Sequence, residues 1–134
     1  MQQEFKKNIT DLLQINLEIN VLLKNNMEKI KVDEESFAAF QSEIENLLSK
    51  KNSFIEKLKN LKACSEAEFS ELKNTKYKDD WQKVQEMENE NLEMIKAAQS
   101  SINEEVAGIV KHSKAISSYK YTKELKPRLF DSEF

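Results

Sequence analysis

Cys64 and His112 have side chains suited to nucleophilic or metal chemistry, and each residue type occurs once in the 134 residues. A cysteine nucleophile needs a neighbouring base or cation that holds it as a thiolate. No such group stands beside Cys64, and His112 lies far along the chain. We therefore interpret Cys64 as a small buried or semi-exposed structural thiol. A lone cysteine also favours a reducing, cytoplasmic location.

His112 could ligate a metal inside a helical bundle, as histidines do in carboxylate di-iron proteins. Such sites place a glutamate three residues before each of two histidines. In this chain Ile109 holds that position, and there is no second histidine. We expect no metal site and no cofactor.

Glutamate groups could supply paired carboxylates for acid–base catalysis. The two candidates are Glu66, Glu68 and Glu71, and Glu86, Glu88 and Glu90. Both groups lie among lysines and asparagines on helix-forming segments, with nothing in the sequence to desolvate them, so we interpret them as solvated faces. The single glycine leaves no glycine-rich phosphate loop. The sequence therefore predicts a protein without enzymatic activity.

Charged residues make up 34% of the chain, and the net charge is −3 with both signs interspersed. Arg128 is the only arginine and there is no basic stripe, so we expect no nucleic-acid partner. No apolar run approaches the ~20 residues that span a bilayer, so we expect no membrane insertion. Met1 to Asp11 shows no signal segment.

One proline and one glycine, with many periodic apolar residues, favour long helices. The first predicted helix covers about Gln3 to Lys31. Apolar residues alternate from Ile15 to Val21, which also suits a strand, but no turn residues bound this run and no partner strand follows. As a helix it is apolar over most of its middle circumference, which predicts a central position.

The second predicted helix begins after an N-cap at Asp33 and follows a heptad repeat. One set of positions holds Phe37, Ile44 and Leu58, and the other holds Phe40, Leu47, Phe54 and Leu61. Lys51 interrupts the first set, and Leu48 and Ile55 widen the stripe on one flank.

A capping box of Ser65 and Glu68 could start a short helix through Lys73, followed by a polar connector at Asn74 to Lys78. We expect Asp79 or Asp80 to cap a long third helix from Trp81 to Tyr119. Every seventh residue of its C-terminal part is an isoleucine: Ile95, Ile102, Ile109 and Ile116. The apolar stripe weakens at Glu88, Asn91, Glu105 and His112.

These elements predict an all-α fold, an elongated antiparallel bundle of three main helices with a flexible C-terminal tail. The short helix at 66–73 stays open. We expect residues 1–120 to form the bundle and residues 121–134 to form the tail, in which Pro127 ends any helix nearby.

The third predicted helix outruns the second by roughly two to three turns, so part of its stripe could stay uncovered and bind a partner helix. Intramolecular packing of the same stripe remains an equal alternative. The partner-binding residues would be Ile102, Val106, Ile109, Val110, Ile116 and Tyr119. The apolar tail predicts further contacts with a partner or a second subunit, through Leu125, Leu129 and Phe130.

Three segments of the chain resemble the flagellar type III export chaperones of the FlgN and FliT kind. They are ENLLSKKNSFIEKLKNL (45–61), MENENLEMIKAAQSSI (87–102) and KAISSYKY (114–121). The chain lacks the glycine that often follows the terminal tyrosine in that family, and its last twelve residues, from Lys123, have no counterpart there.

The resemblance implies a cytosolic chaperone without enzymatic activity. Its protein client would be a flagellar hook-junction or cap protein, which it would deliver to the export apparatus. The alternative is a structural coiled-coil adaptor or self-associating scaffold, in which the same stripes pair between identical chains as a homodimer.

Overall fold

The computed structural model describes residues 1–26, 34–113, 130 and 134, with the side chains of 34–37, 99 and 101–113 left out of the description. The described chain consists of helices α1 (Gln2–Asn26), α2 (Glu34–Cys64), α3 (Glu66–Glu71) and α4 (Lys78–Ser113), with a π-helical turn, η2, at Leu72–Lys76. No strand occurs in this described part. The all-α bundle is therefore confirmed, and the strand interpretation of 15–21 is excluded.

Helix α1 occupies the centre of the bundle, as its broad apolar surface predicts. It contacts both α2 and α4, which contact each other far less. Phe5 stacks on Trp81 at the start of α4, and Asn20 meets Asn91 further along, so α1 and α4 run in the same direction. Helix α2 runs antiparallel to both.

The buried face of α2 differs slightly from the predicted heptad stripe. Leu48 and Ile55, expected at the flank, are buried, whereas Leu47 and Phe54 are only half-buried. A straight helix has 3.6 residues per turn, so a stripe of residues seven apart rotates by about 20° per heptad around the helix. The residues that face the core therefore shift from Leu47 and Phe54 to their neighbours Leu48 and Ile55. The predicted break and cap at Val32 and Asp33 lie outside the described residues.

Helix α3 begins where the capping box predicts. The Ser65 hydroxyl accepts a hydrogen bond from the Glu68 N–H at 3.4 Å. The predicted connector at Asn74 to Lys78 is wrong, because the chain continues as η2, in which the Tyr77 N–H donates to the Leu72 carbonyl at 2.8 Å. This wider turn allows Leu72 and Tyr77, five residues apart, both to be buried.

Helix α4 begins at Lys78, so Asp79 and Asp80 lie in its first turn and not at its cap. The Trp81 backbone N–H donates a hydrogen bond to the Tyr77 carbonyl at 2.9 Å. The first helical hydrogen bond of α4 is therefore accepted by a residue whose side chain is buried. The two aspartates still lie where the positive end of the helix dipole favours them.

Candidate protein-binding site

The predicted partner-binding residues belong to the C-terminal part of α4 and to the segment after it. The positions on α4, whose side chains lie outside the described part, are Ile102, Val106, Ile109 and Val110. The positions outside the described residues altogether are Ile116, Tyr119, Leu125 and Leu129. Among the predicted contacts, only the surroundings of Phe130 are described, and the contact role of the others stays a prediction.

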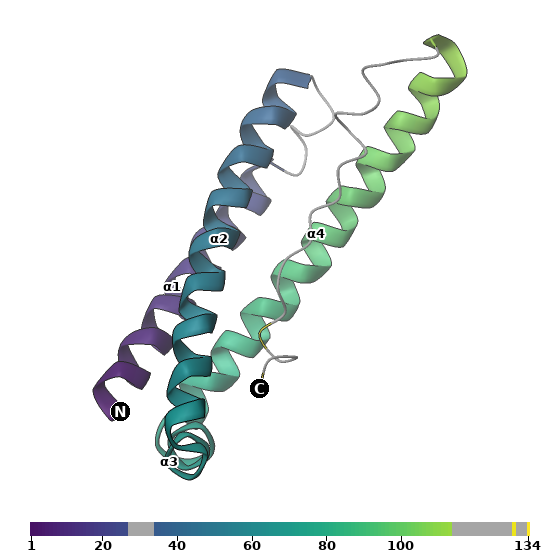
Figure 1. Ribbon diagram of the computed structural model, residues 1–134. Coiled ribbons are helices and arrows are strands. Elements are labelled where there is room, and N and C mark those ends of the chain that lie inside the picture. The colour runs from purple at the N-terminus through teal and green to yellow at the C-terminus, as the bar shows by residue number, and fades with distance from the viewer. Residues whose placement is uncertain (27–33, 114–129, 131–133) are drawn as a thin grey trace.

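The backbone register shows how far α4 extends past the described end of α1. Asn20 meets Asn91, and from these residues α1 continues six residues to Asn26 while α4 continues 22 residues to Ser113. At 1.5 Å per residue, α4 extends about 24 Å further. Figure 1 shows the C-terminal end of α4 leaning away from α2.

Helix α2 covers more of α4 than α1 does, but not its full length. Lys51 meets Glu88, and α2 reaches back 17 residues from Lys51 to Glu34. The first residue of α2 therefore lies level with about residue 105 of α4. Val106, Ile109 and Val110 lie beyond that level, in the last roughly two turns of α4.

Phe130, one of the predicted tail contacts, is fully buried against its own bundle. Its ring centroid lies 4.5 Å from that of Trp81, and its N–H donates to Glu88 Oε1 at 3.4 Å. Phe134 packs nearby, 5.6 Å from Phe69 and 5.3 Å from Trp81 between centroids. Phe130 therefore contacts its own chain here, and a contact with a partner stays a prediction.

Trp81 lies at the centre of an aromatic cluster, with its ring in contact with those of Phe5, Phe69, Phe130 and Phe134. The cluster consists of Phe5, Phe69, Tyr77, Trp81, Phe130 and Phe134. Edge-to-face and offset contacts of this kind add to the hydrophobic burial of the rings. Because its members come from α1, α3, α4 and the tail, the cluster joins these elements at one end of the molecule.

A buried polar cluster lies between α1, α2 and α4, and consists of Asn16, Asn20, Lys51, Glu88 and Asn91. The Lys51 ammonium pairs with the Glu88 carboxylate. The side-chain amide of Asn91 accepts a hydrogen bond from Asn20 Nδ2 at 3.0 Å and donates one to the backbone carbonyl of Asn16 at 2.8 Å. These contacts connect all three long helices.

The interpretation of Glu88 as part of a solvated face is wrong, because its side chain is only 4% exposed. The sequence carried the signal, since Lys51 and Glu88 each interrupt an apolar stripe, but their pairing was missed. Asn16 and Asn20 were missed as core residues as well. When several helices each carry a polar residue at a core position, these residues are expected to meet inside the bundle, and this rule could have predicted the cluster.

The electrostatics of the cluster follow from its burial. Desolvation lowers the pKa of Lys51, and the attraction and hydrogen bond of Glu88 offset this only in part. At the surface, hydrogen bonds from Asn20 and Lys24, together with the charge of Lys24, lower the pKa of Glu90. The void beside the cluster measures about 10 Å³, no more than one water molecule needs, so the cluster is not a ligand pocket.

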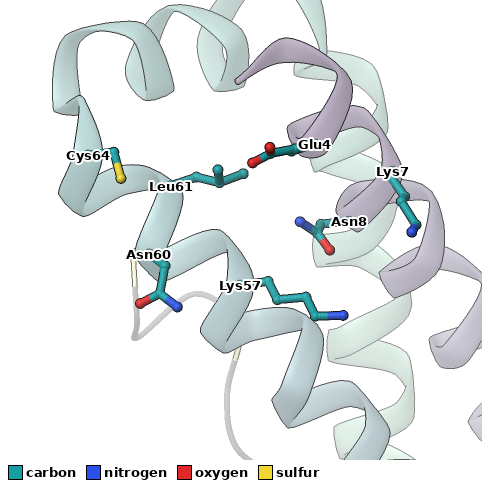
Figure 2. Close-up of a pocket in the computed structure, with 7 residues that line it drawn as sticks. All are labelled: Glu4, Lys7, Asn8, Lys57, Asn60, Leu61 and Cys64. Atoms are coloured by element: carbon teal, nitrogen blue, oxygen red, sulfur yellow. The ribbon is translucent and has the colours of Figure 1, made fainter.

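A larger cavity of about 400 Å³ opens between the start of α1 and the end of α2 (Figure 2). Its lining residues are Glu4, Lys7, Asn8, Lys57, Asn60, Leu61 and Cys64. Cys64 is exposed, contrary to the buried or semi-exposed position expected, because it ends α2 where the chain turns into α3. The side chains of this cavity form no arrangement of nucleophile and base.

Metal-binding groups do not gather in the described part of the chain, where no three His, Cys, Asp or Glu side chains are placed to hold an ion. Among the described helices, none has an apolar stretch long enough to cross a lipid bilayer.

Comparison with protein-family models, with curated proteins and with solved structures gives no match.

Proposed function

We propose that this protein is a cytosolic export chaperone without enzymatic activity. It binds an amphipathic segment of a flagellar secretion substrate, a hook-junction or cap protein, and keeps that segment soluble until the export apparatus receives it. The class of client rests on the resemblance of the three sequence segments to the FlgN and FliT kind of chaperone. The mode of binding rests on the helix register.

The observation that carries the proposal is the reach of α4 beyond the described end of α1 and the first residue of α2. This part of α4 bears Val106, Ile109 and Val110, an apolar series with helical spacing. A secretion substrate with an exposed apolar helix face tends to aggregate, and a long helix with its own free apolar stripe can cover that face. We call residues 102–113 of α4, which include this part, the α4 ridge.

The test compares capture of cytosolic proteins by the wild-type chain and by Ile109→Asp, with the captured proteins identified by mass spectrometry. We expect the wild type to recover a flagellar filament-associated protein and Ile109→Asp to lose it, because a buried unpaired carboxylate is costly in an apolar interface. Circular dichroism should show nearly unchanged helicity in the variant. A collapse of helicity would mean that Ile109 belongs to the core, and recovery of the bait alone would favour the scaffold alternative.

A further inference from the structure

Two large apolar side chains on α1 remain on the surface although α1 is the central helix. Leu17 is 44% exposed and Val21 is 50% exposed, and no other large hydrophobic side chain of the described residues is exposed to this extent. The two residues lie one turn apart on the same face of α1. Packing among the described residues leaves this face uncovered.

Leu17 and Val21 form one side of a groove between α1 and α2 with a volume of about 390 Å³. Leu22 of α1 and Leu47 of α2 are half-buried, pack against the core and also line the groove. Apolar side chains at one-turn spacing beside a second helix form the kind of surface that binds the apolar face of an amphipathic helix. We call it the α1–α2 groove.

The charges of the α1–α2 groove are of one sign. Glu18 of α1 and Glu43 of α2 line it, both are exposed, and neither forms an ion pair with a described residue. The other polar lining residues, Gln14 and Asn25, are neutral. A ligand that covers the apolar side chains of the groove therefore lies close to the carboxylates of Glu18 and Glu43. Lysine or arginine side chains on the ligand would neutralise these two charges.

We propose that the α1–α2 groove binds a basic amphipathic helix of a partner protein, one whose apolar residues are flanked by lysine or arginine. This interaction surface is separate from the α4 ridge, so it goes beyond the proposed chaperone function and does not depend on it. The apolar contact with Leu17, Val21 and Leu47 supplies affinity. The pairing with Glu18 and Glu43 supplies selectivity for basic helices.

The acidic lining argues against two other occupants. In a two-fold dimer through this groove, the groove of one copy would face the same groove of the other. Glu18 and Glu43 would then lie close to the negatively charged Glu18 and Glu43 of the second copy. An anionic lipid surface would repel the same carboxylates. A basic helix satisfies both the apolar and the charged parts of the groove.

The experiment uses fluorescence anisotropy with a labelled synthetic helix of about 18 residues, with leucines on one face and flanking lysines. A matched peptide carries glutamate in place of lysine. We expect the lysine peptide to bind the full chain at least about tenfold more tightly than the glutamate peptide. We expect Val21→Asp to weaken its binding by about tenfold or more, while the exposed control Ala67→Asp in α3 leaves it unchanged. The Glu18→Lys/Glu43→Lys variant should reverse the preference between the two peptides.

The result that overturns the proposal is equal binding of the lysine peptide by the wild type and Val21→Asp when both are equally helical by circular dichroism. Loss of binding in Ile109→Asp but not in Val21→Asp would place the peptide on the α4 ridge and would also overturn it. A dimer in light scattering that Val21→Asp dissociates, or anionic vesicle binding that Val21→Asp removes, would assign the groove to another occupant. Failure of the Ile109→Asp capture test alone leaves this proposal standing.

Discussion

Lys51 and Glu88 are the residues where the sequence pattern and the folded core disagree most clearly. Each interrupts an apolar stripe, and both side chains are only 4% exposed in the bundle. The free energy lost when two charges leave water offsets most of the free energy gained from their attraction, so such a pair contributes little net stability. Loss of one partner, however, leaves the other charge buried and unpaired. The pair therefore favours the single alignment of α2 and α4 in which the two charges meet.

We expect Lys51→Met to lower the free energy of unfolding by about 3–5 kcal/mol, because Glu88 would remain buried without its partner. The double variant Lys51→Met/Glu88→Leu should recover most of this loss. Urea unfolding followed by circular dichroism measures both effects.

The exposed pair Lys24–Glu90 provides the matched control, since its side chains are 59% and 50% exposed. Lys24→Gln should leave the free energy of unfolding nearly unchanged, because solvent screens an exposed ion pair. If Lys51→Met costs no more than Lys24→Gln, the burial of the Lys51–Glu88 pair in solution is contradicted.

At the scale of the elements, the π-helical turn η2 and the tail determine the geometry of the aromatic end. Leu72 begins η2 and Tyr77 follows it, and both side chains are buried, because the wider turn brings residues five apart close to the same face. The tail then places Phe130 beside Trp81 and Glu88. The tail is thus attached to the bundle at the two of its residues that the structure describes, Phe130 and Phe134.

We expect Phe130→Ala to lower the free energy of unfolding by about 3–5 kcal/mol, because it removes a fully buried ring. Trp81 is the only tryptophan, so its fluorescence reports directly on the loss of this contact. The emission should shift to longer wavelength as water reaches the indole. Leu17→Ala, at an exposed position, should leave both quantities nearly unchanged. Identical emission and stability in Phe130→Ala and the wild type would show that the tail does not dock on Trp81.

At the scale of the whole molecule, apolar periodicity sufficed to predict the all-α class, the three long helices and the central place of α1. The spacing of Ser65 and Glu68 predicted the start of α3. Apolar periodicity did not predict η2, because the burial of Tyr77 at the end of this turn involves Phe5 of another helix, which lies far away in the sequence. It did not predict the Lys51–Glu88 contact either. The heptad pattern of one helix shows which of its core positions are polar, but it does not show which polar residue of another helix lies opposite.

The candidate site depends on both levels of information. The sequence identified the apolar series on α4, and the structure adds that α4 extends past the described end of α1 and the first described residue of α2. The exposed face of Leu17 and Val21 had a sequence signal, the apolar run at 15–21, but that signal was used only to predict a central helix. Which parts of a broad apolar surface become buried depends on the direction of the neighbouring helices, and only the tertiary structure contains that information.

The most direct test of the account asks whether the α4 ridge is open to solvent in the isolated molecule. The rate of thiol alkylation would be compared between Cys64→Ser/Ile109→Cys and the buried control Cys64→Ser/Ile95→Cys, since Ile95 is 4% exposed. The Cys64→Ser change removes the exposed native thiol. We predict that the thiol at position 109 reacts at nearly the rate of a free thiol and that the thiol at position 95 reacts at least about tenfold more slowly. Equal protection of both thiols in a monomeric sample would mean that the same chain covers the ridge, and would contradict the proposed mode of client binding.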